Sequence, residues 1–304
     1  MRSFPRLPLA VLAPLAILLA AACAATFTPA SVVEDLRVLA IVADPPELRL
    51  SPAAGGNTVT LHAVAVAPPA APGGPPRTPA AADVTWSFCP YSIGAAAGYA
   101  CAIPACESTL PAAADGSVTV DPLAELMKPA CVDALAGLGT GGGGGPGSGG
   151  SIETLVRYVA TLDGLRREAV QRIPVWFGTP PATAPNLNPV IVDPVTLGED
   201  CSGQAAPCSV ASVSLDVTID ASSFQPYPVG VDRTVEETIV ISFFTTAGRF
   251  KYDYGQATSA SPGTGTLLEA KELGGATQAL VWVVARDLRG GEAVKGPYAV
   301  VFSK

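Results

Sequence analysis

Proline and glycine recur along almost the whole chain, and their spacing limits what it can fold into. The 304 residues include 30 Pro and 31 Gly. Both residues interrupt helices, because proline lacks a backbone N–H and glycine loses more backbone entropy on folding than other residues. The runs between them are short, apolar and rich in β-branched residues, which is typical of strands joined by turns. The sequence therefore predicts a mostly β protein of the sandwich type.

A proline-rich stretch divides these apolar runs into two groups. Residues 178–187 form the predicted linker between them. Residues 59–67 illustrate the strand pattern, since apolar residues alternate there with small or polar ones, as in a half-buried strand. The candidate strands before the linker are 36–42, 59–67, 84–88, 155–160 and 169–177, and those after it are 188–192, 209–219, 237–245, 264–270, 279–286 and 297–302.

Residues 89–150 interrupt the strand pattern and are predicted to be an insertion. They hold four cysteines and end in a glycine tract, whose composition is typical of a flexible loop. One helix is predicted there, because Asp121 is a suitable N-cap and Pro122 fits the first helical position. Residues 89–134 are the predicted ligand-binding region, since loops on rigid scaffolds tend to carry function.

A gapless repeat relates the ends of the two strand groups. A shift of 124 residues (292 − 168 = 124) aligns Glu168 with Glu292 and Tyr158 with Trp282. Both segments have the pattern of a strand, a polar turn and a second strand. The sequence therefore predicts a duplicated domain, each copy closing with a hairpin.

Some of these residues resemble landmarks of immunoglobulin-type sandwiches. Trp86 resembles the buried Trp of their third strand, and Tyr158 and Trp282 lie where such domains carry a corner tyrosine. Antibody domains have a cysteine two residues further on, where this chain has Ala160 and Val284. The resemblance therefore implies the wider immunoglobulin-like sandwich class, without the antibody disulfide.

The N-terminus has the features of a signal peptide. Arg2 and Arg6 form a short positive region ahead of the apolar run 7–22. That run is too short, and too interrupted by proline, to be a comfortable transmembrane helix. The sequence therefore predicts export, followed by cleavage after residue 22.

Residues 19–23 resemble a lipobox, the bacterial motif whose cysteine is lipidated and becomes the new N-terminus. Cys23 is therefore the predicted lipid attachment site, although Ala20 stands where the motif prefers leucine. The alternative is ordinary cleavage at an Ala-x-Ala site without lipid. The chain has seven cysteines, so removing Cys23 leaves six, an even number that favours lipidation in an oxidising compartment.

As a whole, the chain resembles Gram-negative bacterial lipoproteins in which a lipobox precedes immunoglobulin-like domains. The segments 21–23, 36–46 and 86–89 carry this resemblance. It implies a membrane partner reached through acyl chains, such as palmitate, on Cys23, and Ala24 after it implies the outer membrane. The predicted organisation is a signal peptide (1–22), a lipidated tether (23–34), a first immunoglobulin-like domain (35–177) with the Cys-rich, partly helical insertion (89–150), the linker (178–187) and a second immunoglobulin-like domain (188–304).

The remaining six cysteines are predicted to form disulfides. Their spacing lacks the close Cys-x-x-Cys pairs of a zinc site, and His62 is the single histidine, so no metal or other cofactor is predicted. Cys201 and Cys208 enclose a short loop and are expected to pair. The other four allow three pairings, of which the favoured one is Cys101–Cys106 inside Cys89–Cys131.

The sequence contains no recognisable catalytic constellation, so the chain is predicted not to be an enzyme. There is no Gly-x-Ser-x-Gly motif, and a Ser-His-Asp or Cys-His arrangement would need His62. That residue lies in the middle of a predicted strand and is expected to face solvent. Residues 137–142 match a dinucleotide fingerprint by letter, but no βαβ unit surrounds them.

Two further groups of residues each have two interpretations. The carboxylates of Asp232, Glu236 and Glu237, and those at 199–200, are either Ca²⁺ ligands at a loop end or, more commonly, solvated turn charges. The aromatic stretch 250–254 is either a contact patch or the aromatic cover of a strand edge.

The charge balance narrows the choice of partners. Without residues 1–22 the chain has 16 Lys and Arg (18 − 2) against 26 Asp and Glu, a net charge of −10. Such a chain repels nucleic acid and anionic headgroups. We therefore expect a lipid-anchored, non-catalytic envelope protein whose domains bind, or act as spacers for, an envelope protein or polysaccharide. The alternatives are an envelope hydrolase that uses carboxylates and a subunit of an outer-membrane assembly.

Overall fold

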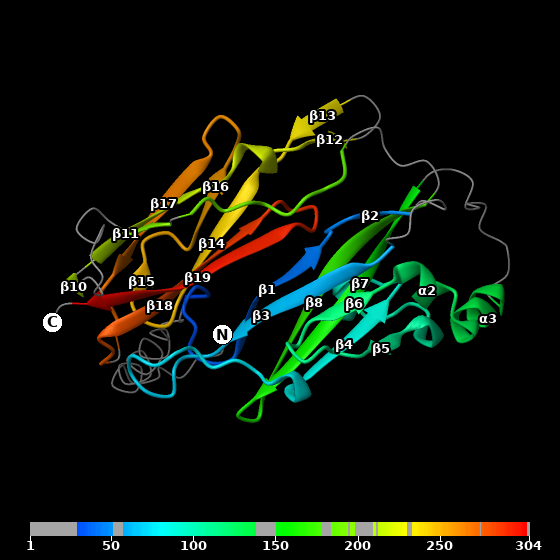
Figure 1. Cartoon of the computed structure of the whole chain (residues 1–304), viewed down its shortest axis with the longest axis horizontal. Coiled ribbons are helices and arrows are strands. Elements are labelled where there is room, and N and C mark those ends of the chain that lie inside the picture. Colours follow the sequence, from blue (N-terminus) through cyan, green and yellow to red (C-terminus); the bar gives the residue numbers. More distant parts are fainter. Residues whose placement is uncertain are drawn as a thin grey trace, which may run out of the picture. The chain divides into compact units, whose positions relative to one another are not determined.

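The structure, a computed structural model, describes residues 29–50, 57–137, 150–177, 184–193, 195–197, 209–210, 212–229, 233–273 and 275–302 (Figure 1). Residues 31–304 group into one compact unit, and the predicted division into two domains stays a prediction. Within the described ranges, no helix is long and apolar enough to cross a membrane. The predictions that lie outside these ranges are the signal peptide, the lipid on Cys23, the Cys201–Cys208 pair, the glycines before Gly150 and the acids Glu199, Asp200 and Asp232.

Strands from the first half of the chain form two sheets that enclose one core. One sheet has the order β1-β3-β6 and the other β2-β8-β7-β4-β5. Buried side chains from both sheets make up the core, so this half is a β-sandwich, as predicted. The strands are β1 (Arg37–Asp44), β2 (Leu48–Arg49), β3 (Val59–Val66), β4 (Val84–Cys89), β5 (Ser108–Leu110), β6 (Val118–Val120), β7 (Gly150–Leu162) and β8 (Leu165–Phe177).

Trp86 is fully buried in this first core, as the resemblance to immunoglobulin-type domains implied. Its indole Nε1 donates a hydrogen bond to Gly116 O at 3.0 Å. Its ring meets Tyr158 of the neighbouring strand edge-on, with the ring centroids 4.7 Å apart. A buried indole N–H needs an acceptor, so this hydrogen bond holds the loop around Gly116 against β4.

Strands from the second half form another pair of sheets around their own core. The sheets have the orders β10-β19-β18-β14-β16 and β15-β17-β11-β9, and β12 and β13 form a separate hairpin. In β14, the buried residues Ile239, Ile241 and Phe243 alternate with half-buried ones, as the period of a strand requires. The strands are β9 (Thr196–Leu197), β10 (Ser209–Val210), β11 (Ser212–Thr218), β12 (Pro226–Val229), β13 (Arg233–Glu236), β14 (Ile239–Thr245), β15 (Arg249–Phe250), β16 (Tyr254–Ala257), β17 (Gly263–Glu269), β18 (Gln278–Arg286) and β19 (Glu292–Phe302).

A third apolar cluster joins the two halves. Alternate residues of β18 point into the second core, whereas Trp282 and Val284 on its other face pack with Leu39 of β1 and Val66 of β3. β18 is therefore buried on both faces. Since apolar area removed from water stabilises at about 25 cal/mol per Å², this packing stabilises the association of the two halves.

The predicted repeat is present as two hairpins, β7–β8 and β18–β19, but their registers differ. Tyr158 lies opposite Ala169. The counterparts of these residues, Trp282 and Ala293, are not opposite each other, because Ala293 pairs with Ala285. The first hairpin has a two-residue turn, whereas the second has a five-residue loop and a bulge in β19, where residues 295–298 lie opposite residues 281–283 of β18. The gapless alignment is therefore wrong as a structural equivalence.

The insertion contains two short helices, α2 (Pro122–Leu126) and α3 (Pro129–Gly137). The α2 prediction is confirmed, because the Asp121 carboxylate accepts hydrogen bonds from the backbone N–H groups of Leu123 and Ala124 at 3.0 Å. The sequence analysis did not predict α3, and the preceding residues offered no capping signal of the kind that Asp121 gives α2.

The four cysteines of the insertion form two disulfides, Cys89–Cys101 and Cys106–Cys131. The predicted pairing of Cys101 with Cys106 inside Cys89–Cys131 is therefore wrong. After β4 the chain turns back on itself, with backbone hydrogen bonds between residues 91–93 and 100–102, and returns Cys101 to the strand end. Cys106 is instead buried beside α3, where Cys131 lies.

One predicted strand, 188–192, is present only as a single bridge between Ile191 and Ile219. Within this segment, Pro189 has no backbone N–H to donate to a neighbouring strand. The side-chain amide of Asn188 donates to Ala43 O at 2.7 Å, and its oxygen accepts from the Glu292 N–H at 3.0 Å. These bonds hold the segment to the first half and to β19, so a regular ladder does not form.

Candidate functional site

The loop between β18 and β19 carries a buried polar cluster. Asp287 Oδ1 accepts hydrogen bonds from the N–H groups of Arg289 (2.7 Å) and Gly291 (2.9 Å), which fixes the loop conformation. Gly290 has a φ of +115°, a conformation that favours glycine. Its carbonyl accepts a hydrogen bond from Gln171 Nε2 of β8 at 2.7 Å. The loop of the second sandwich is therefore fixed against the first.

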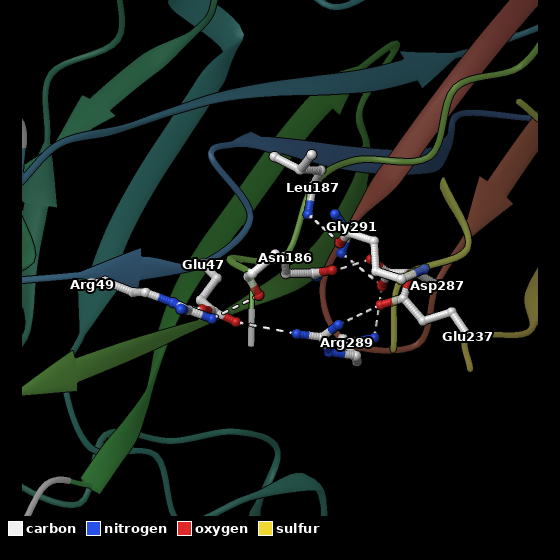
Figure 2. Close-up of polar contacts among 10 residues, drawn as sticks. Glu47, Arg49, Asn186, Leu187, Glu237, Asp287, Arg289 and Gly291 are labelled. Atoms are coloured by element: carbon white, nitrogen blue, oxygen red, sulfur yellow. Dashed lines mark hydrogen bonds and ion pairs between the residues drawn. The ribbon is translucent and has the colours of Figure 1, made fainter. Parts of the chain in front are cut away.

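Arg289 links acids from both halves of the chain, as Figure 2 shows. It forms an ion pair through Nη1 with Glu237, and its Nη2 lies 3.3 Å from Glu47 Oε2. Its guanidinium also lies over the ring of Tyr227, 4.9 Å from the centroid, a stacking that suits a planar cation. Glu47 is paired in turn with Arg49 Nε at 2.6 Å. We call Glu47, Arg49, Glu237, Asp287 and Arg289 the junction cluster.

The junction cluster has three acids and two arginines, and its acids are almost fully buried. Burial raises the pKa of Glu237 above its usual range, and the neighbouring Asp287 carboxylate raises it further. Burial likewise raises the pKa of Asp287, against the lowering effect of its hydrogen bonds to the loop. Arg289 is therefore the cation that keeps two crowded carboxyl groups compatible with folding.

Asn186 adds an amide to this cluster. Its side chain is fully buried, and Nδ2 donates to Asp287 Oδ2 at 2.9 Å. Its Oδ1 has no hydrogen-bond partner among the described residues. The amide of asparagine can donate a hydrogen bond to a carboxylate through Nδ2. After a half-turn of the side chain it can instead accept one from a protonated carboxyl group through Oδ1. Asn186 can therefore accommodate either protonation state of Asp287.

Further polar contacts connect the two halves beside the junction cluster. Glu292 pairs with Arg286 (2.8 Å) and accepts a hydrogen bond from the Ile41 N–H of β1 at 2.9 Å. Burial raises the pKa of Glu292, while Arg286 acts to lower it. These contacts cross from β19 to β1, so the interface holds both apolar and polar groups.

A hollow of about 430 Å³ opens beside this interface, lined by both charged and apolar residues. The two acids among the described residues that line it are Glu153 and Glu292. Glu153 is paired with Arg172 at 3.5 Å, and Glu292 is paired with Arg286. Acid–base catalysis by carboxyl groups would need two free carboxyl groups that face each other, and the two that line this hollow are both paired. A smaller hollow of about 190 Å³ is lined largely by the Pro/Ala/Gly loop at residues 68–74 and by β18 residues.

The structure separates the residues that the sequence grouped as candidates. His62 is exposed on β3, as predicted. Glu236 is exposed and bonds Ser259, whereas Glu237 is buried and paired with Arg289, so the two do not converge on one ion. Among the described residues, no three His, Cys, Asp or Glu side chains are grouped as metal ligands.

Sequence reasoning missed Glu47, Asp287 and Arg289. The loop sequence offered one signal, an Asp followed within four positions by two glycines, which is typical of a tight side-chain-capped turn. The sequence offered no signal for the partners of Arg289, because they lie 52 and 242 residues away in the chain.

We expect the raised pKa of Asp287 to give a measurable pH dependence. The folded state keeps a proton that the unfolded state releases above the ordinary pKa of 3.8. The stability that this proton contributes is full below that value and is lost as the pH rises through the folded pKa. In urea titrations from about pH 4 to about pH 7, the free energy of unfolding of the wild type should therefore fall relative to that of Asp287→Asn.

Met127→Ala is the control for this experiment, because Met127 is 64% exposed and its replacement removes no titratable group. Its pH profile should follow that of the wild type. Identical profiles for wild type and Asp287→Asn would contradict the prediction.

Neither a protein-family model nor a curated protein matches the sequence. Among solved structures, the chain is similar to the fibronectin(III)-like modules of CbhA from Clostridium thermocellum, at 13% identity and a TM-score of 0.22, covering 88% of this chain and 93% of that one. It is also similar to the FN1–FN3 domains of chicken CNTN1, at 11% identity and a TM-score of 0.23, covering 90% and 68%. At such values the fold assignment rests on the sheets and cores described above.

Proposed function

We propose that the chain is a lipid-anchored, non-catalytic protein of the cell envelope, with two immunoglobulin-like sandwiches that act together as a binding or structural module. The observation that carries this proposal is the junction cluster. Its buried charged groups are paired with one another across the two halves of the chain. Charges used in this way hold a scaffold in place and leave no free group for proton transfer.

The hollow beside the interface supports the same conclusion. Its carboxylates Glu153 and Glu292 are paired with arginines, and the single histidine lies on β3, outside the residues that line it. An envelope hydrolase would instead need a carboxyl group free to give or take a proton at the hollow. The geometry therefore favours a module that positions or binds over one that catalyses.

Anchoring through Cys23 is the second part of the proposal. It rests on the resemblance of residues 19–23 to a lipobox, and the resemblance carried by Ala24 points to the outer membrane. Several acyl chains on one cysteine bind a bilayer firmly, whereas one chain binds only marginally. The proposal therefore predicts stable membrane association through the acyl chains, with no helix among the described residues that could span a bilayer.

The intact mass of the native protein, extracted from membranes, tests the anchor. We expect a chain that begins at Cys23 and carries acyl groups. Cys23→Ala should leave the membrane fraction, because it loses the proposed lipid attachment site. The exposed-site variant Met127→Ala, which keeps Cys23, should stay in the membrane fraction. A native chain without lipid, cleaved at an Ala-x-Ala site, would refute the anchor.

A further inference from the structure

The segment that follows the predicted tether is bound to the second sandwich at a defined place. Ser31 Oγ donates to Asp253 Oδ1 at 2.6 Å. The Ser31 carbonyl accepts from the Thr245 N–H at 2.9 Å, and the Val33 N–H donates to Thr245 O at 2.7 Å. Ser31 is itself buried. The chain therefore enters the folded unit beside Asp253, at the end of β14.

Two large aromatic side chains flank this entry point and face solvent. Tyr252 is 58% exposed and Tyr254 is 66% exposed, the highest values among the tyrosines of the described residues. Asp253 between them points inward to Ser31, as alternation along an extended chain requires. The Lys251 ammonium lies over the Tyr252 ring, 5.4 Å from its centroid. We call Lys251, Tyr252 and Tyr254 the aromatic edge.

The backbone around the aromatic edge is held firmly, so its exposure is not the result of a loose loop. Thr266 Oγ1 accepts from the Tyr252 N–H (3.1 Å) and donates to Tyr252 O (2.8 Å). Tyr254 begins β16 and lies opposite Ser242 of β14. The two phenol rings are therefore presented from a fixed frame at the edge of the sheet.

Tyrosine next to lysine has the chemistry of a membrane interface. The phenol has an apolar body and a polar tip, and it concentrates where one end of the side chain is apolar and the other is wet. Lysine places its stem on apolar surface and its ammonium in water or near headgroup phosphates. A pair of exposed tyrosines with an adjacent lysine thus matches the headgroup region of a bilayer.

The length of the predicted tether brings such a surface within reach. Ser31 lies eight positions after Cys23 in the chain, and a fully extended chain spans at most about 28 Å over eight steps. A lipid on Cys23 would therefore keep the aromatic edge close to the bilayer. Tethering at this range gives a high local concentration, so even weak side-chain contacts would be populated.

We propose that the aromatic edge contacts the lipid surface in which Cys23 is anchored, and so fixes which side of the second sandwich faces the membrane. This inference rests on the proposed lipid anchor. The net charge of −10 in the chain after residue 22 opposes binding to anionic bilayers. The contact is therefore with interfacial groups of zwitterionic lipid, with Lys251 as its only cation.

The test uses the acylated full chain in phosphatidylcholine vesicles whose acyl chains carry bromine, a short-range quencher of tryptophan fluorescence. Tyr254→Trp places a probe at the aromatic edge, and Met127→Trp places a matched probe at an equally exposed site (64%) in the insertion. The wild type supplies the background of the three native tryptophans. We expect Tyr254→Trp to lose about half of its added emission, and Met127→Trp to lose almost none.

Hydrogen exchange gives a second measurement that needs no substitution at the aromatic edge. Amides of residues 251–256 should exchange several-fold more slowly in vesicles than in the lipid-free Cys23→Ala variant. Equal quenching of the two tryptophan probes, with unchanged exchange at 251–256, would overturn the proposal. If an oligosaccharide such as chitotetraose shifts the Tyr254→Trp emission while the bromolipid does not, the aromatic edge binds glycan and the membrane contact is also refuted.

The intact mass of each sample separates the two levels of inference. A sample without acyl groups refutes the lipid anchor itself. An acylated sample that fails the quenching and exchange tests leaves the anchor in place and refutes only the contact of the aromatic edge.

Discussion

Replacing Arg289 with alanine is expected to lower the free energy of unfolding by about 3–5 kcal/mol, because the change leaves buried carboxylates without their cation. Glu237 has a fully buried side chain, and Asp287 is almost completely buried. Each already has a pKa raised by burial, with Arg289 acting in the opposite direction. Without that guanidinium, both carboxyl groups must take up protons or the loop must open.

Urea titration near neutral pH measures this change, with Arg172→Ala as the matched control. Arg172 pairs with Glu153 at 3.5 Å, and both side chains are more than half exposed, so its removal should change the free energy of unfolding by less than about 1 kcal/mol. The double variant Arg289→Met with Glu237→Gln should recover part of the loss, since it also removes one of the buried charges. A loss below about 1 kcal/mol for Arg289→Ala would contradict the buried ion pairs.

The same variant should loosen the association of the two halves. Arg289 pairs with Glu47 in the first half and with Glu237 in the second. Other links remain, among them the β18 face packed on β1 and β3 and the hydrogen bonds Gln171–Gly290, Ile41–Glu292 and Asn188–Ala43. Calorimetry of the wild type should give one transition, and that of Arg289→Ala a broader or divided one.

Sequence patterning was sufficient for the strands whose two faces differ. In β3 apolar residues alternate with small or polar ones, and the strand forms close to the predicted position. The burial of Trp86 was expected from its resemblance to the buried Trp in the third strand of immunoglobulin-type sandwiches. In these cases the deciding interaction, burial of one face, is encoded within the strand itself.

Prediction was weaker where the deciding partner is distant in the chain. The seven residues from Ala279 to Ala285 are all apolar, which is the mark of a strand covered on both faces. This apolar run predicts that both faces of β18 are buried, but it does not show that β1 and β3 pack on one of them. The cysteine pairing failed for the same reason, because it depends on how the chain turns after β4 and where α3 lies.

The sequence offered no local indication that these charged residues form the junction cluster. An arginine in a glycine-containing loop is usually solvated, and nothing in the local sequence shows that Arg289 is largely buried. Its partners Glu47 and Glu237 are likewise ordinary acids near strand ends. Only the docking of the two sandwiches, driven by the apolar faces around Trp282, brings these charges together.

Replacing Trp86 with alanine is expected to cost about 3–5 kcal/mol in the free energy of unfolding. The side chain is almost completely buried, and its loss removes the edge-on contact with Tyr158 and leaves a cavity between the two sheets. It also leaves Gly116 O without the indole donor that it now accepts from at 3.0 Å. The cavity and the lost donor act together, so the expected cost lies well above that of an average substitution.

Two variants separate these contributions. Trp86→Phe keeps most of the ring volume and loses the hydrogen bond, so we expect about 1–2 kcal/mol. Met127→Ala, at a site that is 64% exposed, should stay within about 0.5 kcal/mol of the wild type. Hydrogen exchange should show the loss of protection first in β4 and β7, which flank the cavity, and later in β11 and β14 of the second core. Equal loss of protection in both cores would contradict the expectation that the first core opens before the second. A cost below about 1 kcal/mol would contradict the central place of Trp86 in the first core.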